Sequence, residues 1–441
     1  MCEQNMTART NVGTSRQPVQ IQDQLARRNE NISVDTARLI HELDRLAEFS
    51  DDVAPAVTRV MLSDTDLAAR AWLLGLLHGA GLDSRVDAAG NIFARWSGSE
   101  PDLPAIATGS HCDAIPHSGR YDGTVGVLGG LEAIRALRTA GFAPRRSIEL
   151  VMFTSEEPTR YGVGCLGSRL LCGQLDGAAA AKLSDETGVL FGDFSRRAGG
   201  QGTLDDVRLR VGHYHAFVEL HIEQGPLLEQ ENCPIGVVTA IAAPAAVRVT
   251  YEGSGGHAGT VLMADRRDAL LPAAKLALAV DRAARTLGSN DTVATTGVLN
   301  VYPGAVNGIP SRTYLEIDVR DIVLERRDTV LERVRCDAQA IGSEHQQVTT
   351  FEVINADAPA SCDPLVVGAV EQACGDIGVK YQRMISRAYH DSLFMARICP
   401  TAMIFIPCRH GYSHRPDEYA APEAIAAGVE VLAGTLSRLA S

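Results

Sequence analysis

The sequence lacks three features, each of which would point to a particular class of protein. It has no uninterrupted apolar run near the ~20 residues of a membrane-spanning helix. It has no block of Lys and Arg, and its net charge is −13, which argues against nucleic acid or an anionic membrane surface as a partner. Its ten cysteines form no CxxC pair of the kind that holds zinc in ribbons. The composition therefore favours a protein that lives in water and binds a small molecule.

The start of the chain also lacks an apolar core segment. Residues 1–32 are polar and include the acidic Glu3, so they are typical of neither a secretory signal nor a transit peptide. We expect this segment to form a flexible arm and the protein to be cytoplasmic. In that compartment the scattered cysteines should be reduced thiols rather than disulfides.

The order of predicted elements indicates an α/β protein with an insertion. At 441 residues the chain exceeds the ~250–300 residues of a usual single core, so two domains are expected. Residues 33–236 alternate apolar strands with amphipathic helices, which predicts a mostly parallel sheet. Residues 237–341 have the pattern of a compact α+β unit, and residues 342–441 return to the first style. We therefore predict one domain over 33–236 and 342–441, interrupted by a second over 237–341.

Four predicted strands end in side chains that can bind metal. The segments are "PAIATGSHCD", "LVMFTSEEP", "HAFVELHIEQG" and "IFIPCRHGYSHRP". Sites in open parallel sheets form beyond the carboxyl ends of the strands, so these residues should converge. Each one alone has an ordinary explanation as a solvated or hydrogen-bonded side chain. The candidates are His111, Asp113, Asp122, Glu156, Glu157, His221 and His414.

The residue types suit a pair of divalent ions. Two cations a few ångströms apart repel each other, and a shared carboxylate offsets that repulsion. Asp122 fits this bridging role, because it follows the strand that ends at His111. Imidazole and carboxylate ligands suit Zn²⁺ or Mn²⁺, and the same donors accept Co²⁺ or Ni²⁺.

The adjacent pair Glu156 and Glu157 is explained by a division of labour. One acid would bind metal, here Glu157, and the other would be free to act as a general base, here Glu156. Asp113, two residues after His111, could accept the proton on the second nitrogen of that imidazole and so determine its tautomer.

The motifs together resemble the M20-type dinuclear metal amidohydrolases. They are "GSHCDAIPHSGRYDGTVGVLGGLEAI", "FTSEEPTRYGVGCLGSRLL", "HIEQGPLLE", "GGHAGTVLMADRRDA", "GIPSRTYLEIDVRD" and "YHDSLFMARI", and they end with "IPCRHGYSHRPDEY". The resemblance runs from about Ser33 to the end of the chain. It is strongest to the branch of ureidoglycolate, allantoate and N-carbamoyl-L-amino acid amidohydrolases, and within it to the enzymes that act on ureidoglycolate.

The resemblance implies a role for each motif residue. Asp122, Glu157 and His414 would hold one ion. His111, Asp122 and His221 would hold the other, with Mn²⁺ the expected metal. Glu156 would be the general base. The inserted unit would be a lid and dimerisation domain whose His257 reaches the active site of the second subunit of a homodimer and polarises the scissile carbonyl there. Implied substrate contacts are Gln224, Asn307, Arg320 and His390.

The expected reaction is hydrolysis of a ureido carboxylic acid. Arg320 could grip the carboxylate in bidentate fashion, although it could equally form a surface ion pair with Asp318 or Asp321. Tyr389 could pair with the α-hydroxyl of ureidoglycolate, or could pack in the core. The alternatives are an N-carbamoyl-L-amino acid, allantoate, and a scaffold of this fold that binds ligands without catalysis.

Overall fold

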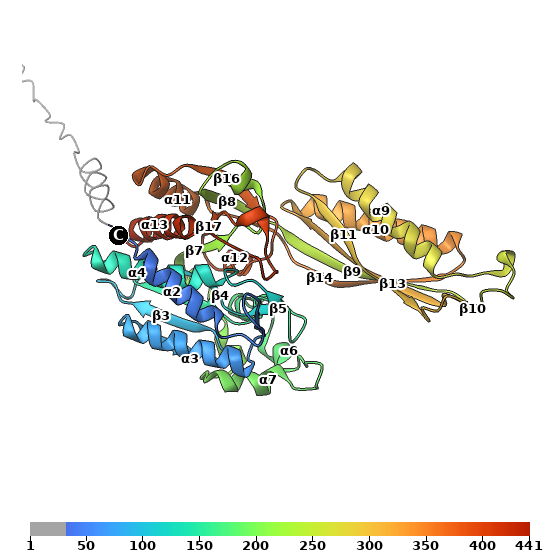
Figure 1. Cartoon of the computed structure of the whole chain (residues 1–441), viewed down its shortest axis with the longest axis horizontal. Coiled ribbons are helices and arrows are strands. Elements are labelled where there is room, and N and C mark those ends of the chain that lie inside the picture. Colours follow the sequence, from blue (N-terminus) through green and yellow to red (C-terminus); the bar gives the residue numbers. More distant parts are fainter. Residues whose placement is uncertain (1–31) are drawn as a thin grey trace, which may run out of the picture.

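The protein folds into two units that lie end to end (Figure 1). The structure is a computed structural model, and it describes residues 32–441. The predicted arm at residues 1–32 lies outside the described residues except for its last position. The larger unit contains a sheet of nine strands and the smaller unit a sheet of four. We call residues 243–356 the smaller unit and the rest of the described chain the larger unit.

The larger sheet has four parallel strands at its centre. The order is β15-β8-β17-β7-β4-β6-β3-β2, with β16 beside β8, and strands β17, β7, β4 and β6 all run in the same direction. The predicted α/β class with a mostly parallel central sheet is confirmed. The strands are β2 (Asp83–Val86), β3 (Ile92–Trp96), β4 (Ala105–His111), β6 (Ile148–Phe153), β7 (Tyr214–Ile222), β8 (Ile235–Ile241), β15 (Ala360–Ser361), β16 (Tyr381–Ser386) and β17 (Thr401–Ile406).

Both faces of this sheet are buried, which explains the continuous apolar runs of its central strands. In β6, Ile148, Leu150 and Met152 pack into one hydrophobic core, whereas Val151 and Phe153 belong to a second core on the other face. Alternate side chains of a strand point to opposite faces, so both sets must be apolar. The first core includes α2 (Thr36–Ala47), α3 (Asp64–Gly79), α4 (Thr124–Thr139), α11 (Pro364–Asp376) and α13 (Pro422–Leu439). The second includes α5 (Leu166–Cys172), α6 (Gly177–Ala181) and α7 (Phe191–Phe194).

The smaller unit is an antiparallel sheet with helices on one face. Its order is β11-β13-β9-β14, and α9 (Leu270–Leu287) and α10 (Leu324–Glu344) pack on it. Val247, Val249 and Tyr251 of β9 are fully buried against the helices, which is the period-two pattern of a half-covered strand. The strands are β9 (Ala243–Glu252), β11 (Val293–Tyr302), β13 (Arg312–Asp321) and β14 (Val348–Ala356).

The smaller sheet reaches beyond residue 341, the predicted end of the inserted unit, because β14 pairs with β9. The sequence of β14 is rich in strand-forming Val, Thr, Ile and Phe, but the strand is largely exposed, and its composition does not show that it joins the sheet of the inserted unit. The other short elements are β1 (Val57–Arg59), β5 (Ala114–Ser118), α8 (Leu227–Gln230), β10 (Gly256–His257), β12 (Gly308–Ile309) and α12 (Ser392–Met395), with 3₁₀ turns at Ser195–Ala198, Leu204–Val207, Met263–Asp265 and Arg409–Gly411.

Two further predictions concern membranes and thiols. Within the described residues, no helix combines the length and apolar character needed to cross a bilayer. Each of the cysteines in residues 32–441 is a free thiol, and Cys336 is the exposed one among them.

Candidate metal centre

The four central strands bring the predicted ligands to one edge of the larger sheet. His111 is the last residue of β4, and His221 is the second last of β7. The acids Glu156 and Glu157 follow β6, and His414 lies in the loop after β17. Because these strands are parallel neighbours, their carboxyl ends meet at the same edge.

Asp122 lies at the centre of the cluster. Its Oδ1 is 3.5 Å from Nε2 of His111 and 3.1 Å from Nε2 of His221. Its Oδ2 is 3.2 Å from Nε2 of His414, and that nitrogen is 3.1 Å from Oε1 of Glu157. The five residues therefore form two groups of three that share Asp122, and the ligand atoms within each group lie within 4.8 Å of one another.

The histidine tautomers suit metal binding. Nδ1 of His111 is 3.0 Å from the carbonyl of Asp113, and Nδ1 of His221 is 2.9 Å from the carbonyl of Ile222. A carbonyl only accepts hydrogen bonds, so each Nδ1 carries a proton, and Nε2, which faces Asp122, is the nitrogen whose lone pair becomes available to a metal ion when its own proton is lost. Lone pairs and carboxylates that converge on one point form a donor set for divalent cations.

The backbone around the cluster is unusual. Gly123 has a φ of 66°, and a Cβ added there would lie 2.4 Å from Nε2 of His111. Glycine is therefore required beside that ligand. Ser155, Gln224 and His414 also have left-handed φ angles, of 56°, 55° and 58°. Such residues are costly outside glycine and gather at functional sites, so they mark this edge of the sheet as one.

Asp113 orders the glutamate pair rather than the imidazole alone. Its two carboxylate oxygens accept hydrogen bonds from the backbone nitrogens of Glu156, at 3.2 Å, and Glu157, at 3.1 Å. The carboxylate lies 3.6 Å from Nδ1 of His111, farther than the carbonyl of the same residue. The predicted contact with the imidazole thus comes mainly from the backbone, because the carboxylate is taken by two amides.

Glu156 lies beside the cluster and has the properties of a base held for proton transfer. Its Oε2 is 3.7 Å from Nε2 of His111, and its Oε1 accepts from the thiol of Cys165 at 3.5 Å. Burial raises the pKa of Glu156 well above its usual range; repulsion from Glu157 acts in the same direction and His111 opposes it. A carboxylate with a raised pKa accepts a proton readily near neutral pH.

The electrostatics of the cluster favour positive charge. Burial by itself would raise the pKa of Asp122, but hydrogen bonds from His111, His221 and His414 hold that pKa well below its usual range. In turn, Asp122 and Glu157 raise the pKa of His414 to about 11. The carboxylates therefore attract cations, whether protons or metal ions.

A cleft of about 640 Å³ opens over the cluster and is lined by both units. Gln224 lies in its wall and donates from Nε2 to Oδ2 of Asp122 at 2.6 Å. Arg320, from the smaller unit, also lines the cleft, where it makes two hydrogen bonds to Asp318, at 2.8 and 3.1 Å. Arg320 thus forms the ion pair with Asp318 that was one of the two predictions, and it also lies at the cleft, where the other prediction places the carboxylate of a substrate.

Tyr389 and His390 occupy different positions. Tyr389 lines the cleft, and its hydroxyl contacts Asp357 and Arg169. His390 is buried behind His221, with ring centroids 4.6 Å apart. Burial lowers the pKa of His390 well below its usual range, and the nearby His221 adds to this. His390 therefore packs against His221 and does not line the cleft, where the prediction of a substrate contact would place it.

His257 and Asn307 are not brought to this cleft by the single chain. His257 belongs to β10, which lies at the far end of the smaller unit (Figure 1). The carbonyl of Asn307 accepts from the backbone nitrogen of Ala258 at 2.9 Å, so both predicted residues lie at that tip. Both are exposed to solvent.

Glu418 is a supporting residue that the sequence analysis did not single out. Its Oε1 accepts from the backbone nitrogens of Tyr121, at 2.7 Å, and Asp122, at 3.2 Å. Its Oε2 accepts from Ser413 at 2.9 Å, and the same hydroxyl lies 2.6 Å from Oδ2 of Asp122. Glu418 therefore ties the loop of the bridging acid to the loop of His414. It stands in the quoted "HRPDEY", where it follows Asp417 and resembles a solvated surface acid.

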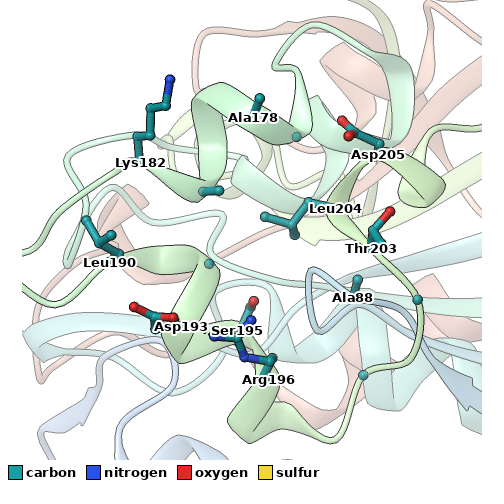
Figure 2. Close-up of a pocket in the computed structure, with 15 residues that line it drawn as sticks. Ala88, Ala178, Lys182, Leu190, Asp193, Ser195, Arg196, Thr203, Leu204 and Asp205 are labelled. Carbon is teal, nitrogen blue, oxygen red and sulfur yellow. Dashed lines mark hydrogen bonds and ion pairs between the residues drawn. The ribbon is translucent and has the colours of Figure 1, made fainter.

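A second hollow lies in the larger unit, in the segment around α6 and α7 (Figure 2). Its lining includes Lys182, Asp193, Arg196 and Asp205 together with small residues, but no histidine. It shares no lining residue with the cleft over the cluster. We assign it no function.

Comparison with known proteins is consistent with this centre. Residues 107–438 match the model of peptidase family M20/M25/M40. A ureidoglycolate hydrolase of Arabidopsis thaliana is 52% identical over 416 residues, which cover 93% of this chain and 87% of that protein. An N-carbamoyl-L-amino acid amidohydrolase of Geobacillus stearothermophilus is 36% identical over 408 residues, 91% of this chain and 98% of that protein. Crystal structures of AtUAH with (S)-hydroxyglycine and with glyoxylate each have a TM-score of 0.86 and 51% identity, and cover 94% of this chain and 99% of theirs.

Proposed function

The chain belongs to peptidase family M20/M25/M40, and from that premise we propose that this hydrolase cleaves the ureido C–N bond of (S)-ureidoglycolate. The assignment of this substrate is supported by the difference in sequence identity, which is 52% to a ureidoglycolate hydrolase and 36% to an N-carbamoyl-L-amino acid amidohydrolase. Addition of water to the ureido carbonyl would release carbamate, which breaks down to CO₂ and ammonia. The hydroxyglycine left behind would collapse to glyoxylate and a second ammonia. This is a step of purine and ureide breakdown.

We propose that the two groups around Asp122 hold two divalent ions, with Mn²⁺ preferred. His111 and His221 would complete one site, and Glu157 and His414 the other. The donor set supports this assignment, because Nε2 lone pairs and carboxylate oxygens converge there. When bound, such ions act as Lewis acids that acidify water and polarise a carbonyl.

Glu156 is proposed as the general base. It would accept a proton from the attacking water and pass it to the leaving nitrogen. Its position beside the metal ligands and its raised pKa support this role. Arg320 is proposed to bind the substrate carboxylate from the wall of the cleft, in competition with Asp318, while Gln224 contacts the ureido group.

The smaller unit is proposed to be the lid and dimerisation domain of a homodimer. His257 and Asn307 lie at its exposed tip, far from the cluster of their own chain (Figure 1). If both residues contact substrate, a second copy must supply them. His257 would then stabilise the oxyanion in the partner's site. A cytoplasmic location stays a prediction from the sequence.

A substrate panel tests the proposal. Purified protein loaded with Mn²⁺ is given (S)-ureidoglycolate, N-carbamoylglycine, N-carbamoyl-L-amino acids and allantoate, and release of ammonia is followed. A site that hydrogen-bonds the α-hydroxyl should favour ureidoglycolate over N-carbamoylglycine by ~10⁴ in kcat/KM, since the analogue leaves polar groups unpaired. Similar values for ureidoglycolate and the carbamoyl amino acids would assign the chain to the carbamoylases, and no turnover of any substrate would indicate a binding scaffold.

A further inference from the structure

The chain passes between its two units twice, and Asp357 begins the second passage. Strand β8 ends at Ile241 and β9 starts at Ala243; β14 ends at Ala356 and β15 starts at Ala360. Asp357 is therefore the first residue after the smaller sheet. It is only 7% exposed, which is unusual for an aspartate in a short connection.

The carboxylate of Asp357 is held by the larger unit. Arg169 of α5 makes a bidentate pair with it, Nη1 to Oδ1 at 3.0 Å and Nη2 to Oδ2 at 2.6 Å. The hydroxyl of Tyr389 also donates to Oδ2. Bidentate pairs of this kind are strong and directional.

Arg169 has little freedom to follow a moving partner. Its Nε donates to the carbonyl of Gly164 at 2.8 Å, and its guanidinium carbon lies 4.4 Å from the centre of the Phe394 ring. The orientation of Arg169 is thus determined by contacts within the larger unit. The ion pair therefore forms only when Asp357 is placed correctly beside Arg169.

The backbone of Asp357 is held by the smaller unit. Its carbonyl accepts a hydrogen bond from Arg327 of α10, which is 2% exposed. Its backbone nitrogen donates to the carbonyl of Pro244, the second residue of β9, at 3.3 Å. One residue therefore links helix α5 of the larger unit to helix α10 and the start of β9 in the smaller unit.

The same contacts decide what Tyr389 can offer to a ligand. Its proton goes to Asp357, and one of its lone pairs accepts from Arg169. The remaining lone pair only accepts. Tyr389 and Arg169 line the cleft that contains Asp122 and Glu156, so a ligand in that cleft that reaches the hydroxyl of Tyr389 meets an acceptor.

We infer that Asp357 is a positioning residue, which fixes Tyr389 and Arg169 at the cleft wall and sets how the smaller unit joins the larger. Its effect on turnover rests on the proposed function, because it requires a substrate whose α-hydroxyl donates to Tyr389. Another ion pair between the units, Arg387 with Asp291 at 2.7 Å, has side chains that are 40% and 34% exposed. Exposed pairs contribute little, so that pair serves as the matched comparison.

The experiment compares Asp357→Asn and Arg169→Lys with Asp291→Asn. Asp357→Asn keeps the size of the side chain but leaves Arg169 without a counter-charge, and Arg169→Lys keeps the charge but loses the planar fork. Both should retain two Mn²⁺ per chain. Both should lower the preference for ureidoglycolate over N-carbamoylglycine by roughly 10- to 100-fold, mainly through kcat, as small displacements of positioning groups do. Asp291→Asn should leave that ratio unchanged.

Hydrogen exchange provides a readout that needs no substrate. Backbone amides of residues 241–246 and 355–361 should exchange on the order of tenfold faster in the Asp357 and Arg169 variants than in the wild type or Asp291→Asn. Unchanged exchange in these segments would overturn the inference, and so would a substrate ratio that stays constant in Arg169→Lys. If the wild type does not hydrolyse ureidoglycolate, the proposed function fails, while exchange still decides whether Asp357 holds the two units. If Asp357→Asn does not fold, Arg169→Lys supplies both measurements.

Discussion

The ligand cluster and the tip of the smaller unit are opposite kinds of site. In the cluster, His111 and His221 are 1% exposed and Glu157 is 4% exposed. At the tip, His257 lies on a short two-residue ladder and Asn307 immediately precedes its second strand, and both are open to solvent. The cluster is complete within one chain, because four parallel strand ends hold it. The tip, in contrast, can take part in a site only when another molecule contacts it.

This difference implies different responses to mutation. The cluster is buried apart from the exposed His414, and the charges of its carboxylates and imidazoles depend on one another, so removal of one member leaves the others unpaired. The tip has no such dependence within the chain. Changes to the five ligand residues should alter metal content, whereas changes at the tip should alter turnover alone.

The largest effect is expected for Asp122→Ala. Asp122 is the residue shared by both groups of ligands, so its loss should remove both ions. Activity should fall by more than the ~10²–10⁴ that loss of a general base costs. Elemental analysis of the dialysed protein measures the metals. Two ions per chain in this variant would show that Asp122 does not bridge.

Glu156→Gln should separate chemistry from metal binding. The amide keeps the shape of the side chain but cannot accept the proton, so kcat should fall by about 10²–10⁴. Metal content and the melting temperature should stay near those of the wild type. The proposed base would be excluded by near-normal turnover in a fully loaded variant.

Subunit mixing tests whether the tip acts across a dimer. His257→Ala and Glu156→Gln are each expected to be inactive alone. After exchange, half of the dimers are mixed and one of their two sites has both intact residues, so about a quarter of wild-type activity should return. The control is a mixture of Glu156→Gln and Asp122→Ala, in which both chains have an intact His257. Each of these two changes damages the site of its own chain, so the mixed dimer has no intact site. Failure to recover activity, with exchange proven by mass spectrometry, would place His257 outside the partner's site.

In a mixed dimer of Glu156→Gln and Asp122→Ala, each site retains its own defect, and activity should stay at the level of the separate variants. Recovery there would mean that exchange or refolding, rather than His257, explains the first result.

Metal removal should abolish turnover, as in Asp122→Ala, but its effect on stability should be the smallest of these and confined to one unit. Ions that bind the folded state stabilise it by about 2.7 kcal/mol at 100 times Kd, so chelation should lower the melting temperature by several degrees. Hydrogen exchange should quicken around β4, β6 and β7 but not in α9 or β13 of the smaller unit. Addition of Mn²⁺ should reverse the change. Equal loss of protection in both units would contradict a cluster confined to the larger sheet.

Much of the larger sheet could be predicted from local patterns. Apolar runs such as residues 148–153 predict strands that are buried on both faces, and the polar residue that ends each run predicts a site at one edge. The family was also evident, because its motifs are local and occur in order. In contrast, the strand-forming residues of β14 do not reveal the sheet to which it belongs, because that is decided by its pairing with β9.

The sequence by itself determined which residue types stand at the ends of the strands. His111, Glu157 and His221 lie at one edge of the sheet because each stands at or just before or after the end of a parallel strand. The tertiary structure alone decided which atoms meet. The carboxylate of Asp113 turned to the amides of Glu156 and Glu157, and the hydroxyl of Tyr389 was taken by Asp357, 32 positions away in the chain. These choices depend on distances between segments that no local pattern encodes, because a hydrogen bond goes to the nearest partner that the packed fold provides.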